Sequence, residues 1–140
     1  MHNLPDRYVE TMPCDPDLLV NLGRVTWASA RLHSGVRDAI NVHKGTPSGA
    51  PFSLTLGQAV AQLEALAKKA GRLDQVSWAQ TLGRPAVNQR NAVAHAVTFT
   101  ADDGLQAIGT MDHSPPGRFL DEELRGVILT LIHASMRLPK

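Results

Sequence analysis

The sequence predicts an all-α protein: a bundle of four or five helices with a short β-hairpin or ordered loop before the last helix. Two observations predict this class. Apolar residues recur at steps of three and four along several segments, and stretches rich in glycine and proline separate those segments. With 140 residues, of which 43% are hydrophobic, the chain is typical of one domain. We expect a single helical domain over residues 1–140, with residues 1–14 as an N-terminal extension.

The first helix is predicted from about residue 16 to 43. Asp15 and Pro16 favour a helix start, because an acidic group and a proline both suit the first turn. A loop at 45–51 ends the helix with two glycines and two prolines. One amphipathic stripe runs through Leu18, Leu22, Val25, Ser29, Leu32, Val36 and Ile40.

A second helix is predicted over about 54–70, with Ser53 as its N-cap and Gly71 as its stop. Its apolar face consists of Leu56, Val60, Leu63, Ala67 and Ala70. A third helical region extends from about Asp74 to Val97. Pro85 should kink or split it, and a fresh helix beginning there would start one turn before Arg90.

The last third of the chain predicts a small β excursion and then a final helix. The runs 97–100 and 105–109 flank an Asp-Gly pair that favours a tight turn between short strands. A loop over 112–117 follows. The last helix is predicted over about 121–138, with acidic residues at its start. Its apolar face carries Leu124, Val127, Ile128, Leu131 and Ile132.

Composition limits the function classes. Fourteen basic and thirteen acidic residues give a formal net charge of +1, which argues against broad nucleic-acid binding through many phosphates. A few phosphate contacts in one cleft remain compatible with that total. Neither a signal peptide nor a membrane span is visible, and the single cysteine, Cys14, leaves no thiolate cluster for zinc. We therefore expect a cytoplasmic protein without a metal or cofactor.

One segment combines residues that suit phosphate chemistry. Arg90, Asn91 and His95 lie among small apolar residues of the third helical region. Arginine can clamp a phosphate with two parallel hydrogen bonds, and histidine can take up and release a proton near neutral pH. This pattern, an arginine with an adjacent polar residue and a histidine a few positions later, resembles the motif of the HEPN superfamily of small helical bundles. The predicted order of helices is similar to that family over most of the chain.

The resemblance implies a metal-independent endoribonuclease, of a toxin or phage-defence kind, in which the 2′-hydroxyl of RNA attacks the adjacent phosphorus. It implies His95 as the proton-transfer residue, Arg90 as the stabiliser of phosphate charge and Asn91 as an orienting residue. Arg84 would add a substrate contact. On one helix Arg90 and His95, five apart, diverge by about 140°. A homodimer that shares the site resolves this divergence.

Several alternatives stay open. Arg37 and His43 form a second match to the motif, at the end of the first helix. His95 could instead be a hydrogen-bonded core histidine, with Arg90 paired to an acidic surface residue. The chain could also be a non-catalytic HEPN-like dimer that binds a partner protein or nucleotide. An antitoxin such as a minimal nucleotidyltransferase is a further possible partner.

The remaining histidines and the tryptophans point to structural roles. His33, His113 and His133 show no recognisable metal-ligand spacing. Trp27 and Trp78 each lie on a predicted helix with apolar neighbours, so we expect core or interface anchors rather than platforms for base stacking.

Overall fold

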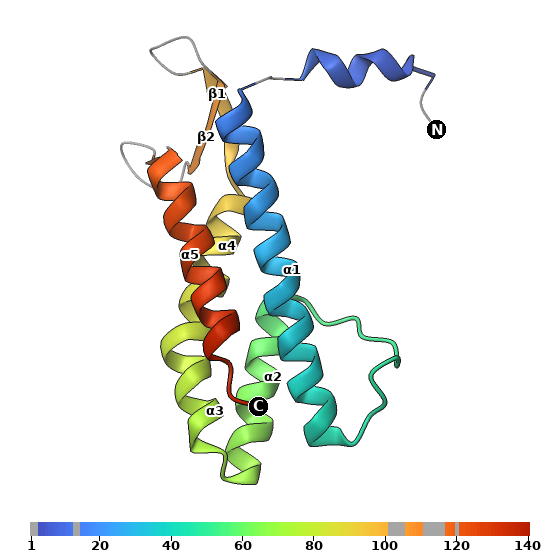
Figure 1. Ribbon diagram of the computed structural model, residues 1–140, viewed down its shortest axis with the longest axis vertical. Coiled ribbons are helices and arrows are strands. Elements are labelled where there is room, and N and C mark those ends of the chain that lie inside the picture. The colour runs from blue at the N-terminus through green and yellow to red at the C-terminus, as the bar shows by residue number, and fades with distance from the viewer. Residues whose placement is uncertain (1–2, 13–14, 101–105, 111–116, 120) are drawn as a thin grey trace.

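The fold is a bundle of helices with a small sheet at one end (Figure 1). The computed structural model describes residues 3–12, 15–100, 106–110, 117–119 and 121–140. Within them the elements in order are η1 (Asp6–Thr11), α1 (Pro16–Lys44), α2 (Leu56–Ala70), α3 (Leu73–Trp78), η2 (Ala79–Gly83), α4 (Arg84–Ala94), β1 (Val97–Thr100), β2 (Gln106–Thr110), β3 (Gly117–Phe119) and α5 (Asp121–Arg137). The predicted all-α class, with a hairpin before the last helix, is confirmed.

Two long helices, α1 and α5, form the centre of the bundle and run side by side in the same direction (Figure 1). The Asp15 side chain caps α1 by accepting from the backbone N–H of Asp17 at 3.1 Å, and Gly45 ends it in the left-handed conformation. The stripe predicted for this helix faces the core. Its buried members are Val25, Leu32, Val36 and Ile40, and Leu18, Leu22 and Ser29 are half-buried.

The core joins α1, α2 and α5 around Trp78, which is 3% exposed. Its indole Nε1–H donates to the carbonyl oxygen of Ala134 at 2.9 Å, so the one polar atom of this side chain is satisfied inside the core. Trp78 is thus the core anchor that the sequence predicts.

The N-cap predicted for the second helix is wrong by two residues. Thr55, not Ser53, caps α2. The reason is a capping box: the Thr55 Oγ1 accepts from the N–H of Gln58 at 3.2 Å, and the Gln58 side chain accepts from the N–H of Thr55 at 3.0 Å. Ser53 has Leu56 three positions later and cannot form this reciprocal pair.

The third helical region is interrupted by a π-helical stretch, η2, directly before α4. Pro85 lies in the first turn of α4, as predicted for a fresh helix start. A proline lacks the backbone N–H of the helical ladder, and a π-helical stretch is one way in which a helix accommodates such a break. The region ends at Ala94, three residues before the predicted end at Val97.

The sheet is antiparallel, with strand order β1-β2-β3, at the end of the bundle where α1 and α5 begin (Figure 1). Val97 pairs with Gly109 and Thr100 with Gln106, which confirms the predicted hairpin strands. The third strand, β3, was not predicted. The predicted turn at 101–104, most of the predicted loop at 112–117 and Cys14 lie outside the described residues.

No helix in the described part of the chain is both long and apolar enough to cross a membrane.

Candidate functional site

Arg90 and Asn91 lie in the last turns of α4, and both are half-buried. Ala86 and Val87, one turn earlier, are buried in the core. Residues three and four apart share a helix face, so Arg90 leaves α4 on the side that faces the bundle. Its Nη1 donates to the Asn91 Oδ1 at 3.1 Å. Asn91 therefore orients the arginine in this chain.

His95 is exposed and stands as the C-cap directly after α4. Its backbone N–H donates to the carbonyl oxygen of Asn91 at 2.9 Å, which holds the residue on the helical path although the helix has ended. The interpretation of His95 as a core histidine is wrong, because α4 ends before it reaches the bundle interior. The imidazole is instead open to solvent.

The Arg90 guanidinium has no carboxylate within salt-bridge distance in the described part of the chain. Its hydrogen bond to Asn91 leaves most of its five N–H donors available for another acceptor. No acidic residue among those described therefore pairs with Arg90, as the alternative interpretation would require. Among the described residues, nothing pairs with the charge of Arg90, and His95 is exposed.

Arg84, the predicted substrate contact, is engaged inside the chain. Its Nη2 pairs with Oε1 of Glu64, a side chain that is only 5% exposed. Gln80 donates to the other carboxylate oxygen at 3.0 Å, and Lys68 lies 3.3 Å from it. The hydrogen bond from Gln80 is the largest cause that lowers the pKa of Glu64; Lys68 and Arg84 lower it further, and burial opposes them. Arg84 therefore compensates a buried charge.

The second match to the motif is also engaged. Arg37 forms an ion pair with its neighbour Asp38 at 3.2 Å. His43 Nε2 lies 2.6 Å from the Gln75 side-chain oxygen, and Gln75 in turn donates to the carbonyl oxygen of Pro139 at 3.1 Å. The contacts of His43 and Gln75 tie α1 to α3 and to the C-terminal residues, whereas the Arg37–Asp38 pair lies within α1.

The other histidines fill separate places. His33 Nε2 lies 2.8 Å from the carbonyl oxygen of Leu54, and its ring meets Phe52 edge-on. His133 is exposed on α5 beside Gln89 of α4, in a shallow groove of about 510 Å³. His113 lies outside the described residues. Among the residues that the structure describes, no three His, Cys, Asp or Glu side chains gather as metal ligands do.

A larger groove lies between α1 and α5, and the sequence reasoning did not find it. Trp27, predicted as a core or interface anchor, is 71% exposed at this groove and not part of the core. A signal was present: Val20, Arg24, Trp27 and Arg31 are spaced four, three and four residues apart and so share one face of α1. The apolar stripe of the same helix that faces the core is more regular, and the prediction for this helix rested on that stripe alone.

Comparisons with known proteins return no match: no family model, no curated protein and no solved structure is similar to this chain.

Proposed function

We propose that this protein is a metal-independent endoribonuclease of HEPN type, a toxin or phage-defence effector whose site is shared across a homodimer. One observation carries the proposal. Arg90 and His95 are both available at the same end of α4, whereas Arg37, His43 and Arg84 are bound to partners within the chain. The resemblance of the motif to the HEPN family supplies the reaction type.

In the proposed reaction, a neutral His95 imidazole takes the proton from a ribose 2′-hydroxyl. The 2′-oxygen then bonds to the adjacent phosphorus, and the bond from phosphorus to the 5′-oxygen breaks. A protonated imidazole returns a proton to that leaving oxygen. The products are a cyclic phosphate and a 5′-hydroxyl end, and positioned acid–base groups typically accelerate such a step by about 10²–10⁴-fold.

Arg90 would stabilise the negative charge that grows on the non-bridging phosphate oxygens, where fixed donors act most strongly in the transition state. Asn91 already accepts a hydrogen bond from this guanidinium, so it would hold the donors in one orientation before RNA binds. Pre-oriented donors need no reorganisation during the reaction.

The directions of the side chains support a dimer. Arg90 faces the bundle and His95 faces solvent from the C-cap. A two-fold axis beside the end of α4 would bring the histidine of one protomer toward the arginine of its partner. A minimal nucleotidyltransferase would be the antitoxin in a toxin–antitoxin pair of this kind.

The test is cleavage of mixed RNA by purified protein in EDTA. We expect the wild-type protein to leave cyclic phosphate and 5′-hydroxyl ends and to spare DNA, which lacks the attacking hydroxyl. Arg90→Ala should lose this activity, and Arg37→Ala, at the look-alike segment, should keep it. An inert wild-type protein, or equal cleavage by both variants, would refute the proposal.

A second candidate is a non-catalytic dimeric module that binds a partner protein or nucleotide. The exposed apolar groove between α1 and α5 favours it, because grooves of this kind are typical of interaction sites. Wild-type protein that binds RNA or a partner without cutting RNA under any divalent-free condition would favour this candidate.

A further inference from the structure

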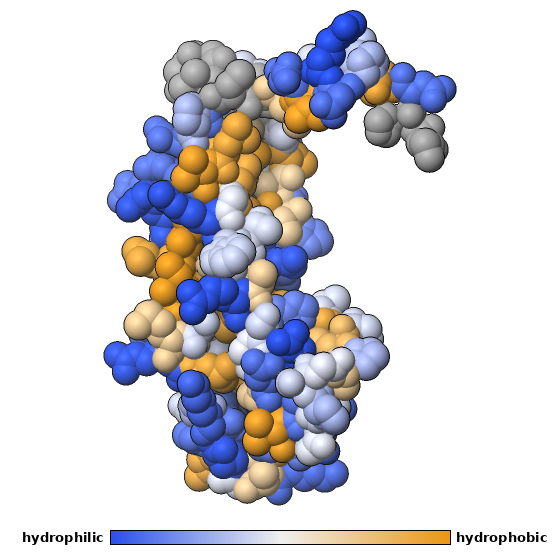
Figure 2. Space-filling view, turned by 45° about the vertical axis from the view of Figure 1, so that its right-hand side comes forward, coloured by the Kyte–Doolittle hydropathy of each residue, from blue (hydrophilic) through white to orange (hydrophobic). Residues whose placement is uncertain are grey.

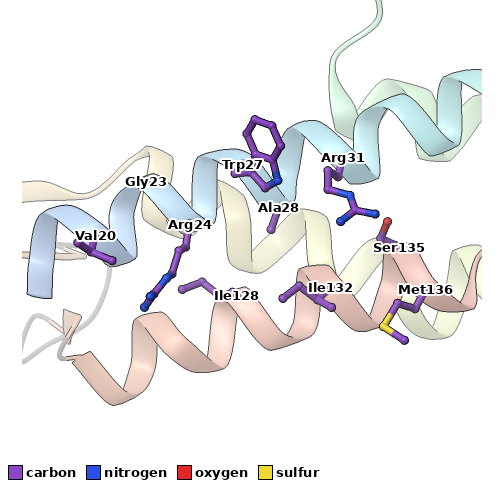
Figure 3. Close-up of a pocket in the computed structure, with 10 residues that line it drawn as sticks. All are labelled: Val20, Gly23, Arg24, Trp27, Ala28, Arg31, Ile128, Ile132, Ser135 and Met136. Carbon is purple, nitrogen blue, oxygen red and sulfur yellow. The ribbon is translucent and has the colours of Figure 1, made fainter.

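The groove between α1 and α5 is lined mainly by apolar side chains. It has a volume of about 620 Å³. Figure 3 shows Ile128 and Ile132 of α5 facing α1 across it, with Trp27 rising from α1. Its lining consists of Val20, Gly23, Arg24, Trp27, Ala28, Arg31, Ile128, Ile132, Ser135 and Met136. Trp27 and Met136 are 71% and 77% exposed, so the groove displays large apolar side chains that nothing covers within the described residues.

Two arginines edge this groove. Arg24 and Arg31 lie on α1 on either side of Trp27, and both side chains reach toward α5 (Figure 3). They are two helical turns apart, or about 10 Å along the axis. Arg24 makes one contact with the neutral Asn21 at 3.4 Å, and neither arginine has a carboxylate partner among the residues described. The groove therefore suits an apolar segment that carries negative charge.

Such a segment lies at the other end of α1. Residues 3–12, here called the N-terminal arm, include η1 and contain no buried side chain. The arm extends away from the bundle (Figure 1), and hydrophobic side chains show on it and on the nearby body (Figure 2). Leu4, Tyr8, Val9 and Met12 are its exposed apolar residues. Asp6 and Glu10 are carboxylates, and with Arg7 they leave the arm a net charge of −1.

We propose that the α1–α5 groove binds the N-terminal arm of a second copy of this chain, and that the exchange is reciprocal. Tyr8 and Val9 of the arm would cover Trp27 and Ile132, and the arm carboxylates would face Arg24 and Arg31. The six residues of η1 span about 12 Å and the other four arm residues up to about 13 Å, whereas the groove from Val20 to Arg31 is about 16 Å long. The arm is therefore long enough to fill it.

The charges disfavour direct packing of one groove against another. A two-fold axis opposite Trp27 would pair two α1 helices antiparallel and set Arg24 against the partner's Arg31. Like charges across such an interface are destabilising. The arm avoids this clash, and in Figure 1 it extends away from the helical bundle. Reciprocal exchange closes the pair as a dimer.

The groove and the arm contain no residue of α4, so substitutions there leave Arg90 and His95 in place. His95→Ala should form the same dimer as the wild-type protein. The proposed RNA cleavage needs a dimer, so an arm variant that becomes monomeric should also lose cleavage. A wild-type dimer that cuts no RNA refutes the ribonuclease and leaves the arm–groove interface standing.

The first experiment is sedimentation velocity of the full chain over micromolar concentrations. We expect a dimer for the wild-type protein and, for the double variant Tyr8→Ser with Val9→Ser, a dissociation constant raised at least about tenfold. Leu73→Ser removes an apolar side chain on α3 that is at least as exposed as Tyr8 and Val9, and this variant should dissociate like the wild-type protein. Far-ultraviolet circular dichroism checks that every variant keeps its helices.

A charge reversal gives the sharper test. Arg24→Glu with Arg31→Glu should weaken the dimer, and so should Asp6→Arg with Glu10→Arg. In a mixture of these two variants, the heterodimer should recover both arm–groove contacts, because each arm then meets a groove of opposite charge. The chain that carries all four changes should recover both contacts in its homodimer. Absence of recovery would contradict the charge pairing and overturn the proposal.

Acrylamide quenching of tryptophan fluorescence reports on the groove directly, because Trp78 is buried and Trp27 is exposed in the single chain. We expect quenching of the wild-type protein to fall as concentration promotes the dimer. A monomer at all concentrations overturns the proposal, whether Trp27 is quenched or is shielded by its own arm. A dimer that withstands the arm substitutions overturns it equally.

Discussion

Two segments of this chain match the same motif of an arginine, a polar neighbour and a histidine a few residues later. They differ in the contacts that these side chains make in the fold. At the end of α1, Arg37 is paired with Asp38 and His43 contacts Gln75 of α3. At the end of α4, Arg90 donates to its neighbour Asn91 and has no carboxylate partner among the described residues, and His95 is exposed. The two segments therefore differ in what they can bind, because side chains already bound in the fold are not available to a ligand.

The largest expected effect separates the two histidines in catalysis. His95→Ala should lower the rate of RNA cleavage by about 10²–10⁴-fold, the usual contribution of a positioned acid–base group. His43→Ala should leave the rate within about twofold once the folded fraction is equalised, since its ring serves α1 and α3. Single-turnover cleavage in EDTA measures both. Equal losses in the two variants would erase the distinction between the segments.

Arg84 extends the comparison to stability. Arg84→Ala removes an ion-paired hydrogen bond to the buried carboxylate of Glu64 and should cost about 1.5–3 kcal/mol of the free energy of unfolding. Arg90→Ala removes one hydrogen bond on a half-buried side chain and should cost less than about 1 kcal/mol. Urea unfolding followed by circular dichroism gives both values. If Arg84→Ala proved neutral and abolished cleavage, Arg84 would belong to the site after all.

Substitution of His43 should lower the free energy of unfolding more than substitution of His95, the reverse of their order in catalysis. His43→Ala leaves the Gln75 oxygen without this partner and should lower the free energy of unfolding by about 1 kcal/mol. His95→Ala changes an exposed side chain and should stay within about 0.5 kcal/mol of the wild-type protein. Thermal and urea unfolding at pH 7 compare them. A larger loss for His95→Ala would indicate a structural role.

The smallest expected effect is a change in how the free energy of unfolding falls at acidic pH. Because the folded chain lowers the pKa of Glu64 below its ordinary value of 4.5, the carboxylate stabilises the fold above that value, and the stabilisation is lost as pH falls through the lowered pKa. Glu64→Gln should be less stable at pH 7 and lose less stability on acidification. Unfolding curves between neutral pH and the acid limit test this; parallel pH profiles would contradict it.

Local signals in the sequence account for most of the helices. The first helix is predicted over 16–43 and observed over Pro16–Lys44, because a capping aspartate, a steady apolar stripe and a glycine stop act within a few residues of each other. The second begins two residues late since Thr55 offers a reciprocal cap that Ser53 lacks. Gly71 ends it as predicted.

The site was less accessible to local reasoning. Arg90 and Asn91 were recognised from residue types alone, but the end of α4 before His95 depends on how the chain enters β1. The predicted contact by Arg84 ignored Glu64, which is 20 residues away in the sequence. The exposure of Trp27 depends on how far apart α1 and α5 lie at that level, a distance set by the side chains of both helices.

The sequence by itself determined the ends of the first helix, the glycine stop of the second and which residue types could handle a phosphate, because caps, breaks and apolar periodicity are properties of neighbouring residues. Only the tertiary structure decided which arginine and which histidine are already bound. Those partners, Gln75 for His43 and Glu64 for Arg84, come from other elements, and they meet only when packing brings the helices together. The same packing left Trp27 and the α1–α5 groove exposed.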